Sequence, residues 1–369
     1  MILVVYHHAI HAYATFASIN VENPIATSSP VVNGQRWIGF DLNVAFNETF
    51  FMPLLFFISG IFVWLGLTKK GIRKYLTGRL IRLGLPFVIG VFFLVPLAYY
   101  PAQLQAGQIT GADLGYGSFW LGMIRSGFGT AGPLWFLWLL LAFNGLAALL
   151  YRLAPPSGGL IRERSNIIFG RPVAFSGALI GISTLAYLPL SMVIGPLEWI
   201  GIGMFHVQAG RILLYLLYFL AGTGIGACGL DRSAFRSDGI LAERWWGWLA
   251  AGLLSFTVFI IMVAVVTDRD RTIASEIAFL ICCGTTVLGL TGLFLRFTKK
   301  SVKLFDSLSE NAYGIYLIHY VFVSWIQYLL LEIRLAPGVK GILVFLITLM
   351  FSWGTITAVR RLPLAAKVI

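Results

Sequence analysis

The sequence predicts an all-α polytopic membrane protein, a helical bundle of about ten transmembrane helices with both termini in the cytoplasm. The first observation is composition: 58% of the 369 residues are hydrophobic and 11% are charged, whereas soluble domains average about 25% charged residues. The second is a series of apolar stretches long enough to cross a bilayer. The third is the distribution of Lys and Arg, which are concentrated in every second loop.

Ten apolar stretches have the length of about 17–25 residues that a helix needs to cross the hydrocarbon layer. Pro86 and Pro96 interrupt the third stretch, and the Gly-rich, polar residues 101–131 after it contain no further span. The chain has no internal repeat, so residues 1–369 are expected to form a single transmembrane domain. We expect the spans at residues 1–19, 44–67, 83–100, 132–151, 173–195, 211–229, 246–266, 273–295, 309–331 and 341–359.

Basic residues orient the bundle, because cytoplasmic loops carry an excess of Lys and Arg. With the N-terminus inside, 20 of the 27 Lys and Arg residues fall on inner loops. This distribution favours an even number of spans. The inner residues are Lys69, Lys70, Arg73, Lys74, Arg79, Arg82, Arg152, Arg162, Arg164, Arg171, Arg232, Arg236, Arg244, Arg296, Lys299, Lys300, Lys303, Arg360, Arg361 and Lys367, and the outer ones are Arg36, Arg125, Arg211, Arg269, Arg271, Arg334 and Lys340.

Charge and cysteine usage exclude some partners. A net charge of +12 would suggest nucleic acid in a soluble protein, but in a membrane protein it is typical of basic loops beside anionic lipid. We therefore expect membrane lipid and no nucleic acid as partner. Cys228, Cys282 and Cys283 lie in or beside apolar stretches and imply no disulfide framework. Residues 1–19 are not expected to be a cleaved signal, because they lack a basic start and carry three histidines.

His7, His8 and His11 are the first candidates for chemistry. Histidine is costly in hydrocarbon unless it faces a cavity or a partner, so an intramembrane histidine indicates function. Helical spacing places His11 on one face with the other two, and imidazole is a natural general base for a hydroxyl. Taken singly, each could instead be an interfacial residue or a hydrogen-bond partner between helices. A zinc site is another alternative, but few carboxylates and no well-spaced cysteines accompany the cluster, so no metal is expected.

Arg79 and Arg82 form the second candidate site. They follow the basic run of residues 69–74 and lead directly into the third span. Spacing of three residues places both guanidinium groups on one helix face, a fork suited to phosphate groups. The alternative is an ordinary basic inner loop.

Polar residues in other spans add candidates. Asn43, Asn47 and Glu48 stand at the head of the second span, Asn144 in the fourth, and Glu310, Asn311 and His319 in the ninth. Each could simply satisfy a neighbouring helix. Glu48 is the most informative of them, because a carboxylate at a membrane entrance could be a proton partner or could bind a sugar hydroxyl.

Five blocks in order along the chain resemble the acyltransferase-3 family of membrane O-acyltransferases, including its glucan- and polysaccharide-modifying members. They span nearly the whole sequence and agree with the ten-span topology. The blocks are residues 4–9 (VVYHHA), 51–60 (FMPLLFFISG), 79–82 (RLIR), 132–137 (GPLWFL) and 309–319 (SENAYGIYLIH).

The resemblance implies transfer of an acyl group, acetyl or succinyl, from acyl-CoA to a hydroxyl of a cell-envelope glycan or related acceptor at the inner (plasma) membrane. In the family a histidine of the first span is taken as catalytic, and the pattern matches His8, with His7 next. The Arg-x-x-Arg pair, taken as the donor site, matches Arg79 and Arg82. The family also has an arginine eleven residues before that histidine, and counting back from His8 passes the first residue of this sequence.

We therefore expect His8, with His7 and His11, to act as general base or transient acyl carrier, and Arg79 and Arg82 to bind the CoA phosphates. Two other functions stay open at this point. A transporter or flippase of a lipid-linked glycan would also have ten spans and buried polar residues, and a family member without activity could serve as a scaffold. The residues expected to contact substrate are Asn47, Glu48, Trp135, Asn311 and His319.

Overall fold

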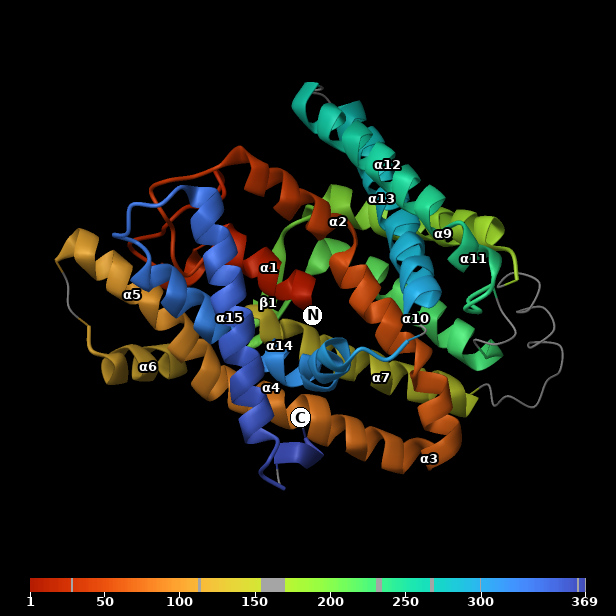
Figure 1. Ribbon diagram of the computed structural model, residues 1–369, viewed down its shortest axis with the longest axis horizontal. Helices are drawn as coiled ribbons and strands as arrows, with labels where there is room; N and C mark the ends of the chain where they lie inside the picture. The colour runs from red at the N-terminus through yellow and green to blue at the C-terminus, as the bar shows by residue number, and fades with distance from the viewer. Residues whose placement is uncertain are drawn as a thin grey trace.

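The computed structural model describes residues 1–27, 29–111, 114–153, 170–229, 234–265, 269–298, 300–363 and 365–368. These residues form a helical bundle (Figure 1). Its helices are α1 (Ile2–His11), α2 (Ile38–Ile61), α3 (Val63–Arg79), α4 (Leu85–Ile89), α5 (Val95–Thr110), α6 (Tyr116–Arg125), α7 (Trp135–Leu153), α9 (Pro172–Ile194), α10 (Ile212–Cys228), α11 (Ile240–Glu243), α12 (Trp245–Val265), α13 (Arg269–Phe297), α14 (Lys303–Leu329) and α15 (Pro337–Val359). One hairpin, β1 (Trp199–Ile202) with β2 (Phe205–Gln208), joins α9 to α10.

The all-α membrane architecture predicted from the sequence is confirmed. In the described part of the chain, eight helical segments are long and apolar enough to cross a membrane. The apolar helix α1 is shorter, with ten residues, and α14 carries several polar residues along its 27 positions. The count of ten spans and the position of the termini stay predictions. Of the basic residues assigned to the inner side, Arg162, Arg164, Arg232 and Lys299 lie outside the described residues.

The first predicted span is wrong beyond His11, where α1 ends. The chain then folds back on itself, because the backbone N–H of Asn33 donates to Ala12 and that of Trp37 donates to Tyr13, both at 2.9 Å. Gln105 on α5 holds this returning segment through two hydrogen bonds to the backbone of Val32. The described residues between Ala12 and Trp37 thus fold back against the end of α1.

The region expected to hold one short span and two loops is helical from Val63 to Thr110, with a kink at Gly71, whose φ of 70° and ψ of 161° are not helical. Two π-helical turns, Leu80–Gly84 and Gly90–Leu94, stand directly before α4 and α5. Pro86 and Pro96 are the second residues of those helices. Because proline cannot donate and its ring clashes with the carbonyl four residues earlier, a widened turn at that place lets the helix continue.

Helices α2 and α10 approach each other at three glycines. A Cβ atom added to Gly60 would lie 2.1 Å from the carbonyl oxygen of Phe219, and one added to Gly222 would lie 2.1 Å from that of Phe57. At Gly226 the corresponding distance is 2.0 Å, to Ile61. Small residues allow this close approach of helix backbones in a membrane, so the α2–α10 pair is fixed by backbone contact.

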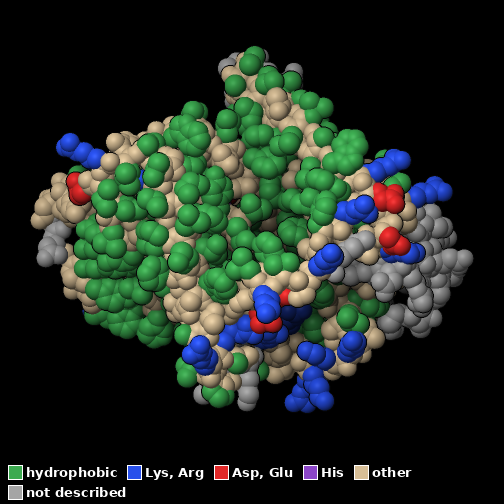
Figure 2. Space-filling view, in the orientation of Figure 1, with side chains coloured by type: hydrophobic (Ala, Val, Ile, Leu, Met, Phe, Trp, Pro, Cys, Tyr) green, Lys and Arg blue, Asp and Glu red, His purple; other side chains and the backbone are tan. Residues whose placement is uncertain are grey.

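The surface is divided between apolar and basic regions. Figure 2 shows hydrophobic side chains over most of the visible face, with Lys and Arg gathered at the right-hand and lower edges; Figure 1 places α3 and the C-terminus at the lower edge. Helix α3 contributes the exposed residues Lys69, Lys70, Arg73 and Lys74. An apolar face with a basic edge is typical of a protein embedded in lipid beside anionic headgroups.

Candidate active site

The three histidines of α1 form one cluster inside the bundle. Helix α1 packs against α2, α14 and α15, and its helical spacing brings the rings together as predicted. The ring centroid of His7 lies 4.7 Å from that of His11 and 5.3 Å from that of His8. His8 and His11 are the partly exposed members of the cluster, beside the buried His7.

Helix α14 adds a fourth imidazole, since the ring of the fully buried His319 lies 5.3 Å from that of His8. Nδ1 of His319 is 2.7 Å from the carbonyl oxygen of Tyr316. Because a carbonyl only accepts, Nδ1 carries the proton and Nε2 is an acceptor. That Nε2 is buried without a hydrogen-bond partner. Tyr320, one residue further along the chain, packs edge-on against His8 at 4.9 Å.

Glu48 connects the cluster to a buried arginine. Its Oε1 lies 3.4 Å from Nε2 of His7, and its Oε2 accepts a hydrogen bond of 2.9 Å from Arg211. Arg211 stands in the turn just before α10 and is buried, with its guanidinium 5.0 Å from the centre of the Phe279 ring. We counted Arg211 only as an outer basic residue in the sequence. A charge at the head of an apolar span is the signal that could have identified it.

The end of α1 is held by a residue that sequence reasoning missed. Nε2 of Gln327, on α14, donates to the carbonyl oxygens of His8 and Ala9 at 3.0 and 3.1 Å. The last carbonyls of a helix have no partner within it, so this amide satisfies two of them. It also fixes the position of His8 relative to α14.

The two arginines of the predicted donor site lie at the start of the π-helical region. Arg79 is half-buried, with its guanidinium 5.0 Å from the ring centre of Tyr75. Arg82 is exposed, and its backbone carbonyl accepts a hydrogen bond from Tyr313 on α14. Tyr313 and His319 are separated by six residues of one helix, which corresponds to about 9 Å along its axis. Helix α14 thus contacts Arg82 through Tyr313 and, further along its axis, His8 through His319.

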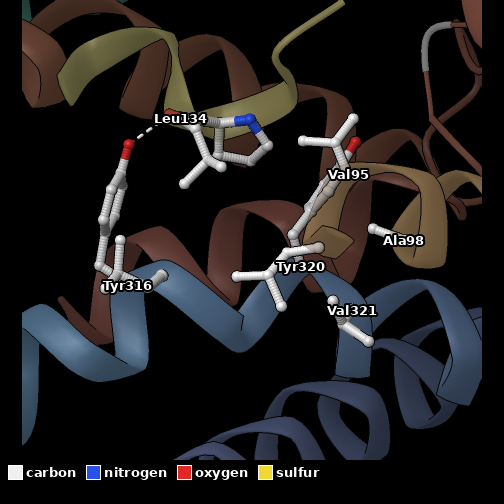
Figure 3. A pocket seen from close by; sticks show the side chains of 9 residues that line it. Val95, Ala98, Leu134, Tyr316, Tyr320 and Val321 are labelled. Carbon is white, nitrogen blue, oxygen red and sulfur yellow. Dashed lines mark hydrogen bonds between the residues drawn. The ribbon is translucent and has the colours of Figure 1, made fainter. Parts of the chain in front are cut away.

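Along the same part of its length, α14 borders a small pocket (Figure 3). Tyr316 and Tyr320 form one side, and Tyr316 donates a hydrogen bond to the carbonyl oxygen of Pro133. Val95 and Leu134 are among the apolar residues opposite. The lining is mostly hydrocarbon with two phenol groups, and the space is about as large as one water molecule.

The other residues expected to contact substrate have partners or neighbours of their own. Asn311 is buried eight residues before His319, about 12 Å along α14, and accepts a hydrogen bond of 3.3 Å from Arg360. Trp135 packs against Trp199 and Tyr215, with ring centroids 5.5 and 5.7 Å apart. Asn47 is buried beside Glu48 on α2. Across the described ranges, no group of three His, Cys, Asp or Glu residues is arranged to hold a metal ion.

Comparison with known proteins gives one match. The family model of the acyltransferase domain, acyltransferase-3, matches residues 1–357 of the 369. Searches of curated proteins and of solved structures give no match. The family match includes α1, the arginine pair and α14, which are the elements that build the candidate site. The chain therefore belongs to the acyltransferase-3 family and is a multi-pass membrane acyltransferase.

Proposed function

We propose that this protein is an O-acyltransferase of the inner (plasma) membrane that moves an acetyl or succinyl group from acyl-CoA to a hydroxyl of a cell-envelope glycan or related acceptor, as polysaccharide-modifying enzymes do. The observation that carries the proposal is the position of His8. It is partly exposed within a cluster of four imidazoles, and it is connected through α14 to a pair of arginines. The whole chain would act as one catalytic domain.

In the proposed reaction, His8 is the general base. Its imidazole takes the proton of the acceptor hydroxyl while the oxygen attacks the thioester carbonyl of acyl-CoA. A new C–O bond forms, the C–S bond breaks, and the proton passes from His8 to the departing thiolate. The products are an O-acyl ester and free CoA. His319 and Tyr320 would confine the ring of His8 from the α14 side.

The donor would approach from the basic edge. Arg79 and Arg82 would bind the CoA phosphates, because guanidinium groups form strong, charge-assisted hydrogen bonds with phosphate oxygens. The exposed basic residues of α3 extend this positive region. The thioester would then lie nearer the histidines, separated from the arginines by part of the length of α14.

The test is direct. Purified protein in detergent is mixed with labelled acetyl-CoA or succinyl-CoA and a glycan acceptor, and loss of thioester and gain of label on the acceptor are measured. We expect His8→Ala to reduce turnover by about 10²–10⁴-fold with an unchanged thermal unfolding midpoint. His206→Ala is the matched control, because His206 lies in the β2 strand and should leave turnover unchanged. Near-full activity of His8→Ala would reject the role of His8.

A further inference from the structure

His7, Glu48 and Arg211 form a chain of contacts that the proposed reaction does not use, and the side chain of Glu48 in its middle is 32% exposed. The three residues come from α1, from α2 and from the turn before α10. His7 and Arg211 are 3% and 6% exposed, so they are largely removed from solvent. Removing the Arg211 charge from solvent costs desolvation energy, which its contact with the Glu48 carboxylate offsets.

The carboxylate is engaged on both sides. Oε1 of Glu48 lies 3.4 Å from Nε2 of His7, and Oε2 lies 2.9 Å from the guanidinium of Arg211. We expected Glu48 to be a proton partner or a contact for a sugar hydroxyl. With His7 and Arg211 already at its two oxygens, the geometry favours the first of these functions over the second.

The contact also selects one form of His7. A carboxylate without a proton can only accept, so the contact stabilises the ring with its proton on Nε2. Nδ1 is then the unprotonated nitrogen, and it is buried without a hydrogen-bond partner. The same ring lies 5.3 Å from His8 and 4.7 Å from His11, centroid to centroid. Tautomer and orientation of His7 therefore depend on Glu48.

Arg211 makes this arrangement possible by compensating the charge of Glu48. Without Arg211, the carboxylate of Glu48, whose side chain is 32% exposed, would lose the cationic partner on its Oε2 side. Arg211 is itself fixed by the protein, since it lies against Phe279 and interacts electrostatically with Tyr187 and Glu276. In this order of dependence, Arg211 holds Glu48 in place, and Glu48 in turn holds His7.

We propose that Glu48, held by Arg211, is the positioning residue of the histidine cluster: it fixes the orientation of His7, with Nε2 directed at the carboxylate, so that the adjacent His8 is held in place to act as base. This inference rests on the proposed function. Arg211 and Glu48 should therefore affect the rate of the chemical step, because neither is required to contact the donor or the acceptor.

The experiment measures kcat and KM for acyl-CoA and for the acceptor in Glu48→Gln, Glu48→Asp, Arg211→Gln and the double variant Glu48→Gln with Arg211→Gln. We expect Glu48→Gln to lower kcat by about 10–100-fold, the range typical of residues that orient a functional histidine, with both KM values within about 2-fold of wild type. Glu48→Asp should recover part of kcat, because the carboxylate is kept.

The double variant tests the order of dependence. If Arg211 acts through Glu48, adding Arg211→Gln to Glu48→Gln should change kcat by less than about 3-fold, which is the signature of coupled residues in a double-mutant cycle. The double variant also removes both charges of the pair, so it keeps the test valid if Arg211→Gln alone does not fold. Losses that multiply would overturn the proposed order.

Two further results would overturn the positioning role. One is a Glu48→Gln variant with unchanged kcat and a raised KM for the acceptor, which would make Glu48 a substrate contact. The other is a ¹⁵N NMR spectrum of histidine-labelled protein that shows the proton of His7 on Nδ1. Because His8→Ala is measured in the same assay, inactivity of the wild-type protein would reject the proposed function, whereas an unaffected Glu48→Gln would reject this inference alone.

Discussion

Helices α1 and α12 show opposite relations between composition and burial. Helix α1 has ten residues, three of them histidine, and lies inside the bundle against α2, α14 and α15. Helix α12 has 21 residues without a charge, and 6% of its membrane-length window is buried within the protein. Figure 1 shows α12 projecting from the bundle together with α13. In lipid an apolar helix needs no protein cover, whereas polar groups require protein partners.

If helices inside the bundle depend on protein contacts and α12 does not, the largest loss of stability is expected at the glycines where α2 and α10 touch. Gly222→Leu should destabilise the protein by about 3 kcal/mol or more, because its side chain would meet the backbone of Phe57 and force the helices apart. Gly247 on α12 is the matched control, since no atom lies within 4 Å of its added Cβ. Thermal unfolding in detergent measures both variants. Equal midpoints for Gly222→Leu and Gly247→Leu would contradict the comparison.

A second pair tests side-chain packing. Phe219 on α10 is fully buried, whereas Leu254 on α12 is 68% exposed. Phe219→Ala should cost about 3 kcal/mol through the cavity that it leaves, and Leu254→Ala should cost less than about 0.5 kcal/mol. The same unfolding measurement applies. A larger loss for Leu254→Ala would show that α12 is covered by protein.

The smallest effect is expected at the exposed end of the proposed donor site. Arg82→Ala should raise KM for acyl-CoA by about 5–10-fold with little change in kcat, because an exposed guanidinium contributes roughly 1 kcal/mol to an ionic contact. The effect should weaken as salt concentration rises. Arg334→Ala, at an exposed arginine after α14 and outside that basic region, is the control. A fall in kcat with unchanged KM would place the function of Arg82 in the chemical step instead.

Much of the candidate site was recognisable before the structure was known. His7, His8, His11 and His319 stood out because imidazole is costly in hydrocarbon, and the structure brings all four together. The substrate residues were less predictable. Asn311 lies about two turns from His319 and instead pairs with Arg360. Helix α14 has 27 residues, so residues two turns apart on it contact different parts of the protein.

The sequence by itself determined the membrane class, the family and the chemical type of the central residues, because hydrophobicity and the cost of a polar group in lipid depend on residue type and local spacing. Only the tertiary structure decided that α1 ends at His11, that Arg211 meets Glu48, and that Gly222 contacts the backbone of α2. Each of these depends on segments far apart in the chain. Such contacts are determined by how the whole bundle packs, and a local sequence pattern does not contain that information.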